Sequence, residues 1–241
     1  MRSFLKEMEW FLAGIIPLPI ARFIVGLRGF LVKRTYYSQN GEDIIISKYF
    51  ESLGINQGHY LDIGCFHPSW ISNTKLLHDQ GWTGVGVDID KYKIKLYSLV
   101  RGVAVSTYCA AIVGKSFQTS RKRASPVFLF KKFWSEIDTL SERVALSSGR
   151  PFIRSNVLTL TIEEIFADNN WNFDFINIDI EGLDLEVICE IDFLKIHPRL
   201  ICFECGENGI FPPNKVVNLL EKNGYKHLFS SGPSHAFALP N

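Results

Sequence analysis

Residues 60–64 (Tyr-Leu-Asp-Ile-Gly) place an acid and a glycine at the end of a short apolar run. A run of this length next to turn-forming residues predicts a buried strand. A helical pattern over residues 70–80 follows the turn. In an open α/β sheet, ligands bind at the carboxyl ends of the strands, and a glycine lets the backbone come close to a ligand. We therefore expect a binding site at Asp62 and Gly64.

The same alternation of strands and helices continues along the chain. Further strands are predicted at residues 82–88, 103–109, 173–179 and 200–204, and helices at 42–53, 91–100, 161–166, 183–190 and 214–223. Residues 225–229 and 236–239, on either side of a Ser-Gly-Pro turn, predict a closing antiparallel pair. This order is typical of a mostly parallel α/β sheet with one antiparallel edge. A length of 241 residues suits one such domain.

Four of the predicted strands end in an acid, namely Asp62, Asp88, Asp179 and Glu204. Parallel strands bring their carboxyl ends to one edge, so these carboxylates are expected to gather there. Stability gives no reason for such a cluster, because the charges repel one another and lose hydration. In nucleotide-binding folds the acid that closes the second strand binds ribose hydroxyls, which is the role we predict for Asp88. The alternative is that Asp88 and Asp90 only cap the next helix.

Two common nucleotide-binding motifs are absent from the chain. The first strand is not followed by Gly-x-Gly-x-x-Gly, and there is no Walker loop. The remaining class is a nucleoside cofactor without a pyrophosphate, and S-adenosylmethionine meets that description.

The composition limits the partners and the compartment. A net charge of +1 argues against nucleic acid as a partner. The five cysteines form no disulfide framework and favour a reducing cytoplasm. Cys202 and Cys205 have no second pair or histidine cluster nearby, so we do not expect zinc.

Residues 10–32 are apolar but are interrupted by prolines and arginines. No uninterrupted run reaches the roughly 20 residues that span a bilayer, and acids stand where a signal peptide would be basic. We expect residues 1–35 to be a helical extension that packs on the domain or on a second copy of the chain. The alternative is a pair of interfacial helices that make peripheral membrane contact. The expected location is the cytoplasm, with membrane association and a homo-oligomer left open.

From about residue 37 to residue 239 the chain resembles the FkbM-type methyltransferases, a class I S-adenosylmethionine-dependent family. The resemblance rests on residues 38–43 (Ser-Gln-Asn-Gly-Glu-Asp), 60–64 with His67-Pro68, 72–74, 81–84 leading to Asp88, 173–182 and 200–204. The block Asp179-Ile180-Glu181-Gly182 is the most specific part. One departure is that Phe66-His67 stands where many class I enzymes carry another glycine.

This resemblance implies a Rossmann-like fold with a mostly parallel seven-stranded sheet and an antiparallel edge. Residues 36–241 would form the methyltransferase domain. The implied activity is S-adenosylmethionine-dependent methyl transfer to a hydroxyl of a sugar, a glycan or a related metabolite. The implied cofactor-binding residues are Asp62, Gly64, Cys65, Phe66, Asp88, Ile89, Ala111 and Asp179.

The candidate catalytic residues are Asp179, His67 and Glu181. Asp179 is the expected base or acceptor-orienting acid, because a sugar hydroxyl needs help to lose its proton. His67 is the second candidate base; the alternative is that it holds the turn at Pro68. Glu181 and Glu204 are expected to orient other groups. We expect no metal, although Mg²⁺ is conceivable because it prefers oxygens such as those of Asp179 and Glu204.

Other functions remain open at this stage. The chain could be a catalytically silent α/β module that binds a nucleoside or a partner, but such a module has no need of Asp179. It could also be a methyltransferase for a protein or a small phenol. The basic run at residues 121–123 would suit an anionic acceptor if it faces the site.

Overall fold

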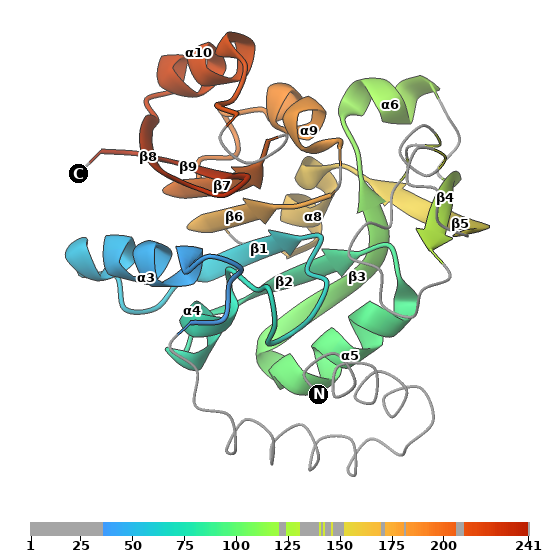
Figure 1. Ribbon diagram of the computed structural model, residues 1–241, viewed down its shortest axis with the longest axis horizontal. Coiled ribbons are helices and arrows are strands. Elements are labelled where there is room, and N and C mark those ends of the chain that lie inside the picture. The colour runs from blue at the N-terminus through green and yellow to red at the C-terminus, as the bar shows by residue number, and fades with distance from the viewer. Residues whose placement is uncertain are drawn as a thin grey trace.

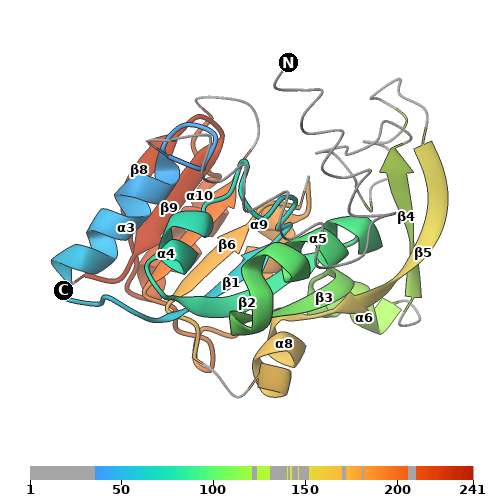
Figure 2. The same cartoon turned by 90° about the horizontal axis from the view of Figure 1, so that it is seen from below.

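The computed structural model describes residues 36–120, 124–130, 140, 142, 146, 152–169, 172–180, 182–205 and 210–240. The expected N-terminal extension, the basic run at 121–123 and Glu181 lie outside these residues. Within them the chain forms one sheet with helices on both faces (Figure 1). Figure 2 shows the same arrangement from below.

The sheet has nine strands in the described residues, in the order β4-β5-β3-β2-β1-β6-β7-β9-β8. The strands are β1 (His59–Ile63), β2 (Thr83–Asp88), β3 (Val105–Ile112), β4 (Ala124–Phe130), β5 (Phe152–Leu160), β6 (Phe175–Ile178), β7 (Leu200–Glu204), β8 (Lys226–Ser231) and β9 (Ser234–Ala238). Strands β5, β3, β2, β1, β6 and β7 pair in parallel, and β9 pairs antiparallel with both β7 and β8. The predicted α/β class, with its mostly parallel sheet and antiparallel edge, is confirmed.

The count of nine strands corrects the expected seven. Strands β5 and β4 extend the sheet beyond β3, and β4 pairs antiparallel with β5, so a second antiparallel edge exists. Most described side chains of β5 are solvent-exposed. A strand of this kind carries no continuous apolar run, which is why β5 is absent from the predicted strands.

Two hydrophobic cores cover the two faces of the sheet. On one face lie α3 (Glu42–Ser52), α4 (Lys75–Asp79) and α5 (Lys91–Arg101), which bury Phe50, Leu77 and Tyr97. On the other face lie α8 (Ile162–Asn169), α9 (Asp184–Glu190) and α10 (Asn214–Lys222), whose buried residues include Ile165 and Leu220. The short segments α6 (Lys115–Ser120) and η1 (Gly102–Ala104) flank β3. Burial on both faces holds the central strands rigid at the edge where their carboxyl ends meet.

The helix predicted over residues 70–80 is much shorter in the structure, where only Lys75–Asp79 is helical. The preceding residues form a loop because their polar groups bind elsewhere. The Ser72 amide donates to the Tyr37 carbonyl at 3.2 Å, and the Thr74 hydroxyl donates to Asp62 at 2.6 Å. These bonds tie the loop to the segment before α3 and to β1.

None of the helices in the described part of the chain is both long enough and apolar enough to cross a bilayer.

Candidate active site

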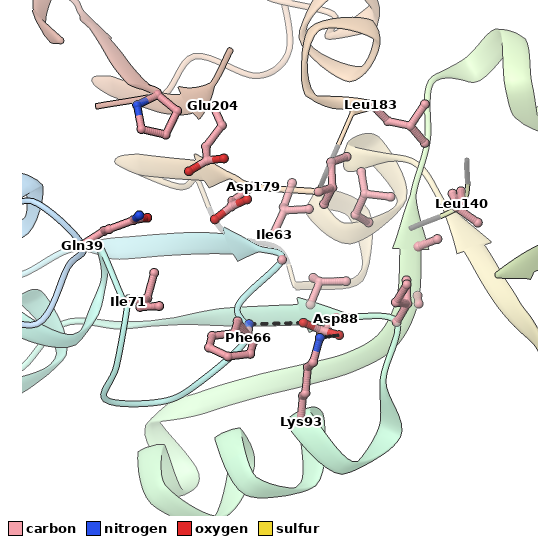
Figure 3. Close-up of a pocket in the computed structure, with 18 residues that line it drawn as sticks. Gln39, Ile63, Phe66, Ile71, Asp88, Lys93, Leu140, Asp179, Leu183 and Glu204 are labelled. Atoms are coloured by element: carbon pink, nitrogen blue, oxygen red, sulfur yellow. Dashed lines mark hydrogen bonds and ion pairs between the residues drawn. The ribbon is translucent and has the colours of Figure 1, made fainter. Parts of the chain in front are cut away.

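A cavity of about 240 Å³ lies at the carboxyl ends of the central parallel strands (Figure 3). Its lining combines apolar side chains with three carboxylates. The lining residues are Gln39, Ile63, Gly64, Phe66, Ile71, Val87, Asp88, Ile89, Lys93, Ala110, Ala111, Ile112, Leu140, Asp179, Ile180, Leu183, Glu204 and Pro233. The predicted site residues Gly64, Phe66, Asp88, Ile89, Ala111 and Asp179 are therefore brought together.

Asp88 has a fixed orientation at the end of β2. One carboxylate oxygen accepts a hydrogen bond from the Phe66 amide at 3.2 Å, and the other accepts from the Asp90 amide at 2.8 Å. The buried Lys93 ammonium lies 3.8 Å from the same carboxylate and offsets part of its charge. The N-cap of α5 is Asp90, which accepts from the Tyr92 amide at 2.7 Å. Capping α5 is therefore the work of Asp90, and Asp88 faces the cavity.

An apolar wall lies beside Asp88. It is built from Ile89 and from the end of β3, where Ala110, Ala111 and Ile112 are buried and line the cavity. Small side chains on a strand leave a flat surface, which suits contact with a planar ring. A carboxylate next to such a wall is the arrangement expected for a ribose joined to a base.

The turn after β1 brings two backbone segments into close contact. Gly64 has φ +78°, and a Cβ built there would lie 1.6 Å from the Asp179 carbonyl oxygen. Phe66 (φ 35°) and Ile71 (φ 49°) are the non-glycine residues with positive φ in the described residues, and both line the cavity. Strained backbone of this kind concentrates at functional sites. The two positive φ angles therefore mark this turn as a candidate part of the site.

Asp179 directly follows β6 and Glu204 ends β7, and their side chains lie near each other at the end of the cavity remote from Asp88 (Figure 3). Burial, together with the negative charges of Asp184 and Glu42, raises the pKa of Glu204 to about 7. Burial also raises the pKa of Asp184 to about 6, against the lowering effect of hydrogen bonds from the Ile180 and Gly182 amides. This end of the cavity can therefore accept protons near neutral pH.

Gln39 reaches the same end of the cavity from the segment before α3 (Figure 3). Asp43 fixes that segment by accepting hydrogen bonds from the Tyr37 amide at 2.7 Å and the Ser38 hydroxyl at 2.6 Å. Glu42 accepts from the Asn40 amide at 2.8 Å. Gln39 was not among the predicted site residues, although the polar run at residues 38–43 was noted.

Asp62 and Cys65 do not line the main cavity. Both line a much smaller cavity next to it, which shares Gly64 and Asp179 with the larger one. Asp62 is 2% exposed and accepts hydrogen bonds from Thr74 at 2.6 Å, Tyr97 at 2.9 Å and Asn177 at 3.0 Å. Direct cofactor contact by these two residues stays a prediction, and the structure gives Asp62 a network role.

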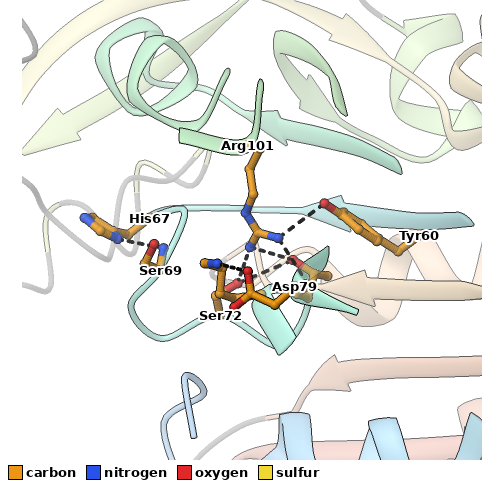
Figure 4. A network of polar contacts seen from close by, with 8 residues as sticks. Tyr60, His67, Ser69, Ser72, Asp79 and Arg101 are labelled. Carbon is orange, nitrogen blue, oxygen red and sulfur yellow. Dashed lines mark hydrogen bonds and ion pairs between the residues drawn. The ribbon is translucent and has the colours of Figure 1, made fainter. Parts of the chain in front are cut away.

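Arg101 is the centre of that network (Figure 4). It is 3% exposed and donates to the Ser72 hydroxyl at 2.9 Å, the Tyr60 hydroxyl at 3.3 Å and the Thr74 carbonyl at 3.2 Å. Its guanidinium also lies over the Tyr97 ring, 4.9 Å from the centroid. Arg101 thus holds the loop after β1 beneath the site.

His67 lies in the turn and lines neither cavity. It is 3% exposed, and its Nδ1 accepts a hydrogen bond from the Ser69 amide at 3.0 Å (Figure 4). This bond fits the alternative in which His67 holds the turn at Pro68. Glu181, the third candidate catalytic residue, lies outside the described residues.

The described residues contain no group of three or more His, Cys, Asp or Glu side chains that could hold a metal ion.

The model of the family described as Methyltransferase FkbM domain matches residues 56–227. The chain belongs to the FkbM methyltransferase family. Membership implies S-adenosylmethionine as the methyl donor, and the match covers every parallel strand that lines the cavity. Gln39 and Pro233 lie outside the matched range but also line it.

Other comparisons add little beyond the family. No curated protein matches the chain. It is similar to the TehB-like SAM-dependent methyltransferase from Corynebacterium glutamicum, at 14% identity, with a TM-score of 0.42 over 92% of this chain and 100% of that chain. It is also similar to monomeric WbdD, at 15% identity, with a TM-score of 0.39 over 82% of this chain and 40% of that chain.

The residues of this FkbM-family site fit the implied cofactor. Asp88 offers a carboxylate to ribose hydroxyls, and the wall at Ala110–Ile112 offers a flat apolar surface to adenine. The carboxylates of Asp179 and Glu204 suit a positively charged sulfonium, because opposite charges attract strongly in a partly desolvated site.

Glu204 should make the stability of the FkbM-family domain depend on pH. Its pKa is about 7 in the folded state against 4.5 for an ordinary glutamate. The folded state therefore holds this proton more tightly, and the contribution to stability is present below about pH 4.5 and is lost as the pH rises through 7. We expect Glu204→Gln to reduce the loss of stability between pH 5 and pH 8.

Denaturant unfolding at both pH values measures this effect. Glu221→Gln, on an exposed part of α10, is the matched control and should keep the wild-type difference. A Glu204→Gln variant with the full wild-type pH dependence would contradict the assignment.

Proposed function

We propose that the protein transfers a methyl group from S-adenosylmethionine to a hydroxyl of a neutral, saccharide-like acceptor. Family membership supports methyl transfer, and the proposal adds the acceptor. The observation that carries it is the charge at the end of the cavity remote from Asp88. Asp179, Glu204 and Gln39 line this end, and Lys93 is the one cation among the described lining residues.

Lys93 faces Asp88 rather than the acceptor end, with its ammonium 3.8 Å from that carboxylate. An anionic acceptor would therefore approach the carboxylates of Asp179 and Glu204, and like charges close together are costly. A polyhydroxylated acceptor instead finds hydrogen-bond acceptors in Asp179 and Glu204, and both donors and an acceptor in the Gln39 amide.

Bound S-adenosylmethionine supplies a methyl group on a positively charged sulfur. Asp88 binds the ribose hydroxyls, and Ala110–Ile112 contact the adenine. Gln39 and Asp179 orient the acceptor hydroxyl toward the methyl group, since an in-line displacement depends mainly on positioning. A carboxylate at this end of the cavity takes the hydroxyl proton.

The test measures S-adenosylhomocysteine formed with three sets of acceptors: methyl glycosides, sugar phosphates and catechol. We expect transfer to one or more neutral glycosides and a loss of about 100-fold in kcat for Asp179→Asn, in line with the usual size of positioning and proton-transfer effects. Transfer only to catechol or only to phosphorylated sugars would overturn the acceptor class. A well-folded protein that binds no S-adenosylmethionine would instead favour a catalytically silent module.

A further inference from the structure

The antiparallel pairing of β7 with β9 holds Glu204 in place at the carboxyl end of β7. Its register partner is Ser234 of β9, and the next residue, Cys205, donates its amide to the Pro233 carbonyl at 2.9 Å. Pro233 lines the cavity beside Glu204. The backbone on both sides of this carboxylate is therefore fixed, and the side chain lies next to Asp179 at one end of the cavity (Figure 3).

The groups around Glu204 are mostly acidic. Glu42 comes from α3, Asp184 from the start of α9, and Asp179 from the end of β6. Glu42 and Asp184 are buried, at 1% and 4% exposure. Cys205 is the nearest titratable neighbour in the chain, and burial raises the pKa of its thiol. Glu204 forms no ion pair with a described cation, so its negative form has no fixed counter-charge there.

A positively charged ligand can therefore offset the negative charge of the Glu204 carboxylate. The implied methyl donor carries one positive charge on sulfur, and the product of transfer carries none there. The cavity therefore meets a cation when the donor binds and a neutral thioether after the reaction.

Resting on the proposed function, we propose that Glu204 is the proton acceptor of the reaction and that donor binding prepares it for this role. Glu204 gives up its proton to solvent when the positive sulfonium enters the cavity. Glu204 then takes the proton of the acceptor hydroxyl as the methyl group is transferred.

The bonds and charges balance without any further reactant. The acceptor O–H bond breaks and an O–CH₃ bond forms, while the S–CH₃ bond breaks and its electron pair stays on sulfur. The proton moves to Glu204. The positive sulfonium and the negative Glu204 carboxylate are both neutral afterwards, so the transfer removes one pair of opposite charges and leaves the net charge of the site unchanged.

The acid strength of Glu204 supports this role. A pKa of about 7 leaves the carboxyl roughly half protonated at neutral pH before the donor binds. An opposite charge within about 4–6 Å lowers a carboxyl pKa by about 1–3, so the bound sulfonium would leave Glu204 ionised. Asp179 then orients the acceptor, and Glu204 is the base.

The test needs no acceptor. Calorimetric titration with S-adenosylmethionine and, separately, with S-adenosylhomocysteine at pH 7 in two buffers of different ionisation enthalpy counts the protons released. We expect the wild type to release about half a proton more on binding S-adenosylmethionine than on binding S-adenosylhomocysteine, because about half of the Glu204 carboxyl groups are protonated before the ligand binds. Affinity for S-adenosylmethionine should rise about tenfold from pH 6 to pH 8 if the pKa falls by about 2.

Variants assign this proton to Glu204. Glu204→Gln should remove the extra proton release and the pH dependence of the affinity for S-adenosylmethionine. Glu204→Asp should keep part of both effects, and Glu221→Gln should behave as the wild type does. The wild-type comparison of the two ligands stands even if Glu204→Gln fails to fold. Equal proton release with both ligands, or an unchanged release in Glu204→Gln, would overturn the inference and leave the methyltransferase function standing. Failure of the folded wild type to bind either ligand would reject both.

Discussion

Replacing Asp88 with alanine is expected to weaken S-adenosylmethionine binding about 100-fold. Hydrogen bonds to a charged group contribute about 1.5–3 kcal/mol each, and two ribose hydroxyls would lose such a partner. A loss of about 3 kcal/mol corresponds to about two orders of magnitude in Kd. The Phe66 and Asp90 amides hold the Asp88 carboxylate in place at the cavity. Calorimetric titration of the two proteins measures the change.

Asp90→Ala is the matched control for Asp88→Ala. Asp90 follows the same strand but caps α5 and is absent from the cavity lining. Its loss should reduce stability by about 1 kcal/mol, as for other N-caps, and leave the affinity within about twofold. Equal losses of affinity in the two variants would mean that Asp88 acts through the fold of the turn and not through the ribose.

Gly64→Ala is expected to be the most destabilising substitution at the site, by more than about 4 kcal/mol. The added Cβ would lie 1.6 Å from the Asp179 carbonyl oxygen, which belongs to backbone and cannot turn away. The positive φ of +78° adds about 1–2 kcal/mol of strain for a residue with a side chain. Because domains of this size are stable by about 5–15 kcal/mol, much of the protein should be unfolded at 37 °C. Thermal unfolding followed by circular dichroism shows this.

Gly54→Ala separates the effect of backbone strain from that of the close contact with Asp179. Gly54 has a similar φ of +70°, but a Cβ there would meet nothing within 4 Å. We expect only the backbone strain of about 1–2 kcal/mol in this variant. If both variants lose the same stability, close contact between the turn and Asp179 is not what requires a glycine at position 64.

The acids at the ends of the predicted strands were the most useful guide in the sequence to the position of the cavity. A strand that is buried on both faces is an apolar run, so its polar last residue is visible in the sequence and marks the edge of the sheet. Asp88 and Asp179 lie in the cavity as expected. Ala111, which the family resemblance implied as a cofactor-binding residue, lines the cavity as well.

Other parts of the site depend on contacts that spacing does not reveal. Asp62, like Asp88, stands at the end of a predicted strand. Its carboxylate, however, accepts hydrogen bonds from Thr74, Tyr97 and Asn177, which come from three other segments of the chain. Gln39 reaches the cavity because hydrogen bonds from Tyr37 and Ser38 to the Asp43 carboxylate fix the segment before α3. The hydrophobic periodicity of the sequence does not reveal such bonds. Strand β5 was not predicted because most of its described side chains are exposed, so its sequence carries no continuous apolar run.

A crystal structure with S-adenosylhomocysteine bound tests the central claim most directly. The account predicts adenine against Ala110–Ile112, both ribose hydroxyls on the Asp88 carboxylate, and the sulfur at the end of the cavity lined by Asp179 and Glu204. A ligand bound outside this cavity, or with its ribose away from Asp88, would contradict it.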